Sequence, residues 1–439
     1  MRLLPSRARA AVACAVACAT AVAAAACTDI TTLKQENPGQ LAASTLYAPQ
    51  NAQLIVNGAI ADFDCAFTRY VVGSGLLTDE LSNAIGSVDN YNYDARRLLT
   101  NADYGTATCG NNQRPPIYTT LSVARASADT ALARLREWTD AEVPSTVNRT
   151  RLIGQMATYA GLSLMLLGEG MCSAAINLGP ELQPAQLFEQ AKIRFDSAVV
   201  SATAANDQPT LNLALLGRAR TLLNLKNPAA AATDAARIPA GFVANMAAEG
   251  TNNRRQNFAF ISINQSNWST VDASFRGLTT ESGVADPRVA VTNTGRAGTA
   301  QGSQVWTPDK YATLTTAMPI ARYAEAQLII AEARVAAGDL AGAATAINAA
   351  RGGRAALGTY SATGQTAAQV LAQIVEERRR ELFLEGHRLG DMRRLGIAFT
   401  PASGVAYPGG GGVYGTQTCF PMPDVERINN PTISGGTGT

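Results

Sequence analysis

Apolar residues recur every three to four positions through the middle of this chain, and this periodicity sets its fold class. Between residues 118 and 237 the period is carried by three segments, Ser122–Trp138, Arg151–Leu167 and Leu187–Ala204. In a helix such spacing gathers apolar side chains on one face, which must be buried against a neighbouring element. Hydrophobic residues make up 46% of the 439 residues, enough for a large core. The sequence therefore predicts a mainly α-helical fold of helices packed on one another.

Two segments of the chain resemble each other in sequence. Arg220–Arg237 reads RTLLNLKNPAAAATDAAR, and Arg334–Arg351 reads RVAAGDLAGAATAINAAR. Each begins at the end of one helix, passes through a turn and enters a second, alanine-rich helix. Small residues let two helices approach closely, so each segment is predicted to form a helix hairpin similar to a tetratricopeptide unit. Because the copies are far apart in the chain, we expect dispersed hairpins within one domain and not a tandem array.

Two regions interrupt the helical pattern, residues 73–117 and 238–316. The first is rich in Asn, Asp, Tyr, Gly and Thr. The second has loops of Gly, Asn, Ser and Thr and contains strand-like pieces at Phe258–Ile263 and Arg288–Thr292. Long irregular stretches in a large domain are commonly functional surfaces. We therefore expect a loop-rich ligand face here, between helical hairpins at about 118–237 and 318–398. The glycine-rich last 40 residues are expected to form loop with a short strand.

The N-terminus has the three-part layout of a bacterial export signal. Residues 1–9 contain three arginines, residues 10–26 are an uncharged run of mainly Ala and Val, and Cys27 follows. An apolar run ending in small residues and cysteine resembles the lipobox of bacterial lipoproteins, in which the cysteine is acylated. We therefore predict a signal peptide over 1–26, lipid attachment at Cys27, a tether over 27–40 and a single domain over 41–439. An ordinary secretory signal is the alternative.

Charge and cysteine content narrow the classes of function. Removing the three arginines of residues 1–26 takes the net charge from +2 to −1, and a nearly neutral chain has no electrostatic footprint for nucleic acid. Four cysteines remain after Cys27, and in an oxidising compartment they are candidates for two disulfides with three alternative connectivities: Cys65, Cys109, Cys172 and Cys419. Isolated buried thiols are the alternative. Without a CxxC motif, and with one histidine, a metal site is not expected.

The most specific sequence stretch covers residues 320–396. It begins IARYAEAQLIIAEARVAAGDLAGAATAINAAR and closes with IVEERRRELFLEGHRLGDMRRLG, and CFPMPDVERINNP follows near the C-terminus. Together these segments resemble the SusD/RagB family of outer-membrane nutrient-binding lipoproteins. The second element of the family pattern is matched, with a shift of one residue at its start, by Glu377, Arg378, Glu381, Gly386, His387, Arg388, Asp391, Arg393 and Arg394. The third is matched by Phe420, Pro421, Pro423 and Glu426.

The charged residues of this stretch also have a purely structural interpretation. Opposite charges lie three or four positions apart in the pairs Glu376/Arg380, Arg378/Glu381 and Glu385/Arg388. Such pairs meet on one face of a helix, so we expect this cluster to hold helices together. The single histidine, His387, has no G-x-S-x-G or H-E-x-x-H motif beside it, and the sequence therefore predicts neither an enzyme nor a cofactor site.

The family resemblance implies a function. It implies a lipid-anchored, surface-exposed lipoprotein of the outer membrane that captures an oligomeric nutrient, an oligosaccharide in the first instance. It also implies delivery of that nutrient to a TonB-dependent (SusC-like) transporter, which the protein covers as a lid. A peptide ligand stays open, because aromatic residues are only 6% of the chain. The alternative from another class is a helical lipoprotein scaffold in an envelope assembly without a small ligand.

Sugar capture needs aromatic platforms for the rings and polar side chains for the hydroxyls. The irregular regions supply seven candidates: Tyr91, Tyr93, Asp94, Arg96, Asn267, Trp268 and Trp306. The alternative is that each aromatic residue is half-buried core at the base of a loop. Trp138, which ends an amphipathic segment, is expected to lie in the core.

Overall fold

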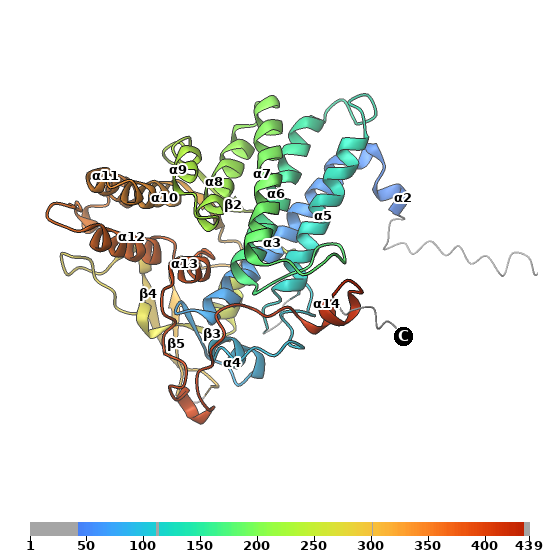
Figure 1. Ribbon diagram of the computed structural model, residues 1–439. Coiled ribbons are helices and arrows are strands. Elements are labelled where there is room, and N and C mark those ends of the chain that lie inside the picture. Colours follow the sequence, from blue (N-terminus) through green and yellow to red (C-terminus); the bar gives the residue numbers. More distant parts are fainter. Residues whose placement is uncertain (1–42, 111–113, 301, 434–439) are drawn as a thin grey trace, which may run out of the picture. The chain divides into compact units, whose positions relative to one another are not determined.

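The computed structural model describes residues 43–110, 114–300 and 302–433 (Figure 1). The chain divides into two compact units, Met1–Ala48 and Pro49–Thr439. The described part of the first unit contains a short helix, α2 (Ala43–Leu46). The predicted signal peptide, the lipid-attachment residue Cys27 and the tether lie outside the described residues.

Helix α3 (Ala52–Leu77) forms the centre of the second unit and packs against two later helices, α5 and α6. Every residue from Phe63 to Leu77 is buried. A helix that is buried on all sides has no amphipathic stripe, which is why periodicity did not predict it. The irregular region expected from residue 73 therefore begins only after Leu77, and a further helix, α4 (Val88–Asp94), lies inside it.

The predicted helices of the middle segment are present, and each packs against the next. They are α5 (Tyr118–Glu137), α6 (Arg149–Gly170), α7 (Pro184–Ala204), α8 (Gln208–Asn224) and α9 (Pro228–Ala235). Asn148 and Asn227 begin α6 and α9, and each side chain accepts a hydrogen bond from a first-turn amide. Trp138, at the end of α5, is buried as expected.

The C-terminal half adds a second group of helices. They are α10 (Tyr323–Ala336), α11 (Leu340–Arg351), α12 (Ala367–Glu381), α13 (Arg388–Leu395) and α14 (Asp424–Asn429). The two similar sequence segments form the hairpins α8–α9 and α10–α11, as predicted. Helix α9 packs against α10, so the hairpins lie side by side although they are far apart in the chain (Figure 1).

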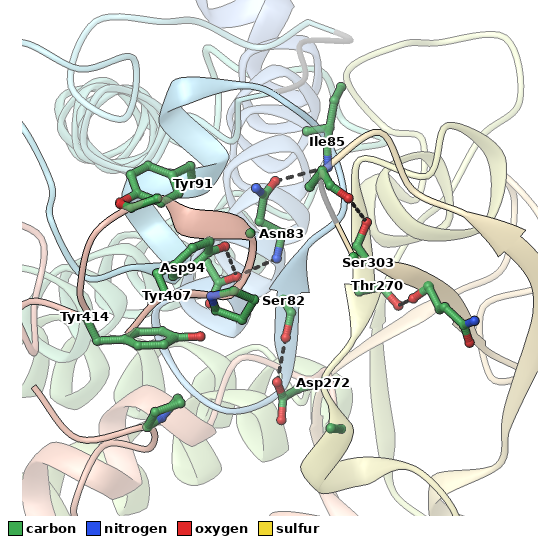
Figure 2. Close-up of a pocket in the computed structure, with 18 of the residues that line it drawn as sticks. Ser82, Asn83, Ile85, Tyr91, Asp94, Thr270, Asp272, Ser303, Tyr407 and Tyr414 are labelled. Carbon is green, nitrogen blue, oxygen red and sulfur yellow. Dashed lines mark hydrogen bonds between the residues drawn. The ribbon is translucent and has the colours of Figure 1, made fainter. Parts of the chain in front are cut away.

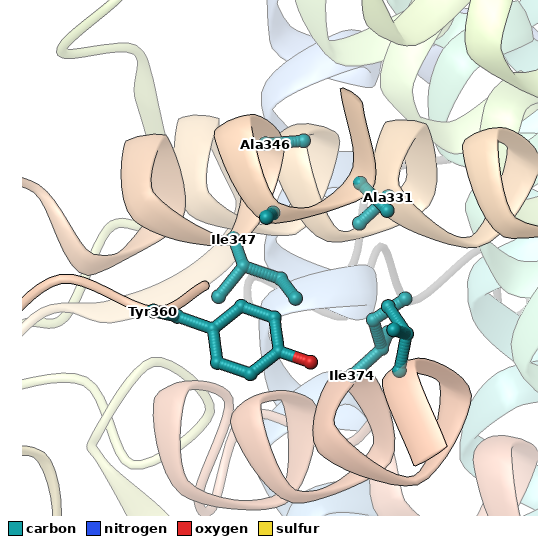
Figure 3. Close-up of a cluster of buried hydrophobic side chains, with 8 residues drawn as sticks. Ala331, Ala346, Ile347, Tyr360 and Ile374 are labelled. Atoms are coloured by element: carbon teal, nitrogen blue, oxygen red, sulfur yellow. The ribbon is translucent and has the colours of Figure 1, made fainter. Parts of the chain in front are cut away.

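A small apolar cluster joins α10, α11 and α12 (Figure 3). Ala331 on α10 and Ile347 on α11 face Ile374 on α12, and all three are fully buried. The ring of Tyr360 closes the cluster, and its hydroxyl donates a hydrogen bond to Gln365 at 2.6 Å. The alanines at this crossing allow the close approach that the sequence predicted.

Strands are short and occur in the loop-rich regions. The described residues form three two-stranded antiparallel sheets: β1 (Leu81–Asn83) with β3 (Ser269–Val271), β2 (Val243–Met246) with β6 (Met318–Arg322), and β4 (Val291–Ala297) with β5 (Gln304–Pro308). Short helical turns lie between them at Ala273–Phe275 and Pro287–Val289.

Three expectations for these regions are corrected. Phe258–Ile263 is helical and leads into a π-helix, Phe260–Gln265, because a short apolar run does not distinguish strand from helix. The strand expected at Arg288–Thr292 starts only at Val291. In the last 40 residues, the described part contains α14 and two isolated bridges, Ala406 with Val413 and Phe420 with Met171, without a regular strand.

The charged cluster is architectural, but only one of the three expected pairs forms. Glu376 and Arg380 are in contact at 2.6 Å. Helix α12 ends at Glu381, and the chain turns through Leu384 and Gly386, both with positive φ. The remaining charges therefore meet distant elements: Arg378–Asp391 (2.7 Å), Arg322–Glu381 (2.8 Å), Lys310–Glu385 (2.6 Å) and Arg388–Asp79 (2.7 Å).

His387 lies inside this network. Its Nε2 is 3.4 Å from an Arg220 guanidinium nitrogen, and its Nδ1 is 3.7 Å from a Glu325 carboxylate oxygen. Burial, followed by the nearby arginines, holds the pKa of His387 well below its usual value, so the imidazole is neutral. This position is a packing site within the core.

Candidate functional site

A cavity of about 780 Å³ lies where α4, the β1–β3 sheet and the C-terminal loop 400–414 meet (Figure 2). We call it the tyrosine cavity. In Figure 2 the labelled tyrosines lie at the left, and Thr270 and Ser303 lie at the right. The polar and aromatic side chains that line it are Ser82, Asn83, Ser87, Tyr91, Asp94, Thr270, Asp272, Ser274, Arg276, Ser303, Gln304, Thr400, Tyr407 and Tyr414.

Three tyrosines form one wall of this cavity. The ring centroids of Tyr91 and Tyr407 are 4.7 Å apart in an edge-to-face contact, and those of Tyr407 and Tyr414 are 5.1 Å apart. The Tyr91 hydroxyl donates a hydrogen bond to the Gly411 carbonyl. Tyr407 and Tyr414 are buried, while Tyr91 is half-buried. The wall therefore offers an aromatic surface whose orientation is fixed by its own contacts.

The glycine run of the C-terminal loop allows this wall to form. A Cβ atom at Gly411 would lie 2.7 Å from a ring carbon of Tyr91, so a larger residue would displace that ring. Gly412 has a φ of 93°, a conformation that L-residues rarely adopt. The Tyr407 amide donates to the Gly412 carbonyl at 2.8 Å and closes the turn. The run therefore places Tyr407 and Tyr414 against Tyr91.

Asp94 lies at the end of α4, at the base of the tyrosine wall. Its carboxylate accepts a hydrogen bond from the Asn83 amide at 2.7 Å and from the Tyr407 hydroxyl at 2.8 Å. Burial raises the pKa of Asp94 to about 7, against the effect of these hydrogen bonds. The charge of this wall therefore changes close to neutral pH.

The raised pKa gives a prediction for Asp94→Asn. The folded state holds a proton on Asp94 up to about pH 7, whereas the unfolded chain releases it near the ordinary value of 3.8. Asp94 therefore lowers the stability of the wild type as pH rises through this window, and asparagine does not. Between about pH 5 and 8, the stability of the variant relative to wild type should rise by about 2 kcal/mol. Urea unfolding across this range measures it, and parallel pH profiles would contradict it.

The opposite side of the cavity is polar. Asp272 accepts hydrogen bonds from the Ser82 hydroxyl at 2.5 Å and from the Ser274 amide at 2.8 Å. The Arg276 guanidinium donates twice to the Val271 carbonyl, at 2.9 and 2.7 Å, and lies 5.3 Å from the ring centroid of Trp306. These contacts hold a carboxylate and a cation in fixed positions beside the aromatic wall. Such a combination suits a polyhydroxylated ligand with an apolar face.

The structure brings together two of the seven candidate ligand residues, Tyr91 and Asp94. Tyr93, two positions from Tyr91, points into the core. Its ring centroid lies 5.6 Å from that of Phe420, and its hydroxyl donates a hydrogen bond to the Pro115 carbonyl. Arg96 lines a different cavity. We therefore leave Tyr93 out of the site proposed below.

The other three candidates lie outside the tyrosine cavity. Trp268 is half-buried against Phe258, with ring centroids 6.3 Å apart, and the carbonyl of Trp268 accepts a hydrogen bond from the Ala84 amide. Its neighbour Asn267 has a φ of 54° at the turn before β3. Trp306 lies on β5 beneath Arg276. Only Trp306 contacts a side chain that lines the cavity.

The lining residues that sequence reasoning missed include Asp272, Arg276, Tyr407 and Tyr414. Tyr407 and Tyr414 flank the run Gly409–Gly412, and that arrangement of two aromatics around a tight glycine turn was a usable signal. Asp272 and Arg276 follow a short strand and have no such local signal. Their role depends on the pairing of β3 with β1, which joins segments about 190 residues apart.

The four remaining cysteines form two disulfides, Cys65–Cys109 and Cys172–Cys419. The Cys172–Cys419 bond joins the end of α6 to the segment that follows the C-terminal loop 400–414.

Within residues 43–110, 114–300 and 302–433, no helix is long and apolar enough to span a membrane. The same residues contain no group of three or more His, Cys, Asp or Glu side chains placed to hold a metal ion.

Comparison with known proteins shows which family and which solved structures the chain is similar to. A model of the SusD family matches residues 242–430. Similar solved structures include a SusD superfamily protein from Bacteroides fragilis (TM-score 0.67, 17% identity, 88% of this chain and 99% of that one). A SusD superfamily protein from Bacteroides vulgatus (0.65, 16%, 87% and 97%) and the surface glycan-binding protein A from Bacteroides fluxus (0.63, 14%, 88% and 97%) are also similar. No curated protein sequence matches the chain.

These matches confirm the resemblance to the SusD/RagB family. Residues 242–430 are similar to the SusD family, and the predicted fold class, mainly α-helical with dispersed hairpins and short strands, is confirmed. At 14–17% identity the solved structures establish the fold alone.

Proposed function

We propose that this protein captures an oligosaccharide in the tyrosine cavity without chemically changing it. The observation that carries the proposal is the wall of Tyr91, Tyr407 and Tyr414 beside the fixed polar groups of Asp94 and Asp272. Aromatic rings contact the apolar faces of sugar rings, and carboxylates accept hydrogen bonds from hydroxyls. The volume of about 780 Å³ lies within the range of small-molecule sites.

The comparisons support this ligand class. Two of the similar structures are described as a SusD-like carbohydrate-binding protein from Bacteroides vulgatus and a surface glycan-binding protein from Bacteroides fluxus. A formed cavity favours ligand capture over the alternative of a scaffold without a small ligand. A binding screen of glycans and peptides on the soluble chain from residue 28 tests the proposal. Capture of an oligosaccharide is expected, whereas exclusive capture of peptides, or no capture, would contradict it.

We further propose that the protein is attached to the outer membrane through lipid on Cys27 and delivers its ligand to a TonB-dependent, SusC-like transporter. The support is the lipobox-like sequence before Cys27 and the family resemblance. A single lipid tether lets the folded unit move over a transporter while keeping it nearby. Recovery of a TonB-dependent barrel with the tagged protein from solubilised outer membrane tests the partner. Its repeated absence would count against delivery.

The lipid anchor gives a prediction for Cys27→Ser. Serine cannot take the thioether-linked lipid, so the variant should be lost from the membrane fraction and appear in soluble fractions. Fractionation followed by immunoblotting measures this, with Val200→Ser, at an exposed position of α7, as a control that keeps Cys27. Membrane retention of the Cys27→Ser variant at the wild-type level would contradict the anchor.

A further inference from the structure

A second cavity, of about 550 Å³, adjoins the tyrosine cavity. Tyr414 lines the first cavity, and the guanidinium of Arg96, 5.2 Å from the ring centroid of Tyr414, lines the second. Thr400 and Pro401 face the first cavity, while the next residues of the same loop, Ala402 and Ser403, face the second. The two cavities are therefore separated by one aromatic side chain and one short loop. We call the second one the arginine cavity.

The charged side chains that line the arginine cavity are both cations, Arg96 and Arg393. Arg96 is only 4% exposed, and one of its terminal nitrogens donates to the Pro401 carbonyl. Its Nε is buried without a hydrogen-bond partner. Within the described part of the chain, no carboxylate lies within ion-pair distance of this guanidinium. Arg96 is thus a buried cation without an ion pair, and only part of its hydrogen-bonding capacity is used.

Arg393, near the end of α13, also lacks an ion pair with a described carboxylate. Its Nη1 donates to the carbonyls of Gly168, Glu169 and Met171 at the end of α6, at 3.3, 2.5 and 3.0 Å. No described carboxylate pairs with it, whereas the adjacent Arg394 pairs with Glu332 at 2.5 Å and Asp391 at 3.0 Å. Burial lowers the pKa of both Arg96 and Arg393 from its ordinary value, and the nearby carboxylates of Asp94 and Glu169 offset this effect only in part.

Two cations that line one open cavity and that form no ion pair with a described carboxylate make a site for an anion, because buried charges are normally paired. The remaining lining includes the ring of Phe399, the side chain of Ile397 and the exposed hydroxyl of Thr416. These groups suit the carbon face and hydroxyls of a sugar that carries the anionic group.

We infer that the arginine cavity binds the carboxylate or sulfate group of an acidic oligosaccharide whose neighbouring residues occupy the tyrosine cavity. This inference rests on the proposed function and specifies its substrate class. The arrangement selects acidic over neutral oligosaccharides, because only an acidic one completes the charge balance of Arg96 and Arg393. Salt weakens this preference, because it screens the charge attraction at a partly open cavity.

Isothermal titration calorimetry with paired probes tests the inference. The probes are a galacturonic acid tetramer with its methyl-esterified form, and a sulfated galactose tetramer with its desulfated form. One acidic member should bind about tenfold or more tightly than its neutral partner, and the pair that does so identifies carboxylate or sulfate as the preferred group. The preference should shrink as NaCl rises from about 50 to about 500 mM.

A variant separates a charge effect from a folding effect. Arg96→Gln removes the cation but also alters its contact with Pro401, so Thr416→Glu is the second variant. Thr416 is exposed, and a carboxylate there reduces the positive charge of the cavity without removing a buried side chain. In Thr416→Glu the ratio of acidic to neutral affinity should fall severalfold, toward one. Thr146→Glu, an exposed position outside both cavities, adds the same charge and should keep the wild-type ratio.

Equal affinity for the acidic and neutral members of both pairs would overturn the inference, as would an unchanged ratio in Thr416→Glu. Binding of none of the four probes, while the glycan screen finds an oligosaccharide ligand, would also overturn it and leave the proposed function standing. Capture of no oligosaccharide in that screen would instead overturn the proposed function.

Discussion

Replacing Arg220 by methionine is expected to lower the free energy of unfolding by about 3–5 kcal/mol. Arg220 lies on α8, and its guanidinium contacts both carboxylate oxygens of Glu169 on α6, at 2.8 and 2.5 Å. It also donates to the Gly386 carbonyl at 2.7 Å. Both side chains are buried, so the variant leaves Glu169 as a buried charge with Asn224 as its remaining side-chain partner. Methionine fills much of the volume, which confines the effect to charge and hydrogen bonding.

Urea unfolding of the variant measures this loss, and Arg134→Met is the matched control. Arg134 pairs with Glu137 at 2.7 Å, but their side chains are 46% and 58% exposed. Exposed pairs contribute about 0–1 kcal/mol, so the control should stay within about 1 kcal/mol of wild type. Equal losses in the two variants would show that burial of the Arg220–Glu169 pair does not determine its contribution.

Removing the Cys172–Cys419 disulfide is the second change with a large expected effect. The bond joins residues 247 positions apart, whereas Cys65–Cys109 spans 44. Disulfides stabilise chiefly by restricting the unfolded chain, and double serine variants typically lose about 2–5 kcal/mol. From the loop lengths, the Cys172/Cys419 variant should lose about 1.5 kcal/mol more than the Cys65/Cys109 variant.

The same variant should also bind ligand more weakly. Cys419 follows the loop that carries Tyr407 and Tyr414, and the Cys172 amide donates to the Phe420 carbonyl at 2.8 Å. Without the covalent bond, this loop is held by non-covalent contacts alone and samples more conformations. Urea unfolding and ligand titration on the same preparation measure both effects. Unchanged stability together with unchanged affinity would contradict this role of the disulfide.

Much of the fold could be predicted from the sequence, because α5 and α7 each place one apolar stripe against a neighbour. Helix α3 could not be predicted in this way, since its C-terminal half is buried on every side and has no stripe. Phe258–Ile263 was wrongly predicted as a strand, because six residues are too few to distinguish the apolar period of a helix from that of a strand. The Glu385/Arg388 pair failed because the chain turns at Leu384 and Gly386, which removes the helical spacing on which the pair was based. Arg378 and Glu381 keep that spacing on α12 but pair with Asp391 and Arg322 instead.

The candidate site could be predicted only where it is local in sequence. Tyr91 and Asp94 lie three positions apart on α4, so their shared helix brings both to the cavity. Tyr93 lies between them but faces the core, because alternate helical positions point in different directions. Tyr407 reaches Asp94 across 313 positions, and Asp272 reaches Ser82 across 190. Such contacts follow from the tertiary fold and leave no periodic trace in the sequence.

Titration of an oligosaccharide from the glycan screen into Tyr91→Ala tests the central claim most directly. Tyr91 is the half-buried ring of the tyrosine wall, and alanine removes the aromatic surface with little loss of buried core. Affinity should fall about tenfold or more, which corresponds to about 1.4 kcal/mol, while the melting temperature stays close to wild type. Tyr323→Ala, at the start of α10 and outside the cavity, should keep wild-type affinity. Equal affinity of Tyr91→Ala and wild type would contradict the assignment of the tyrosine cavity as the ligand site.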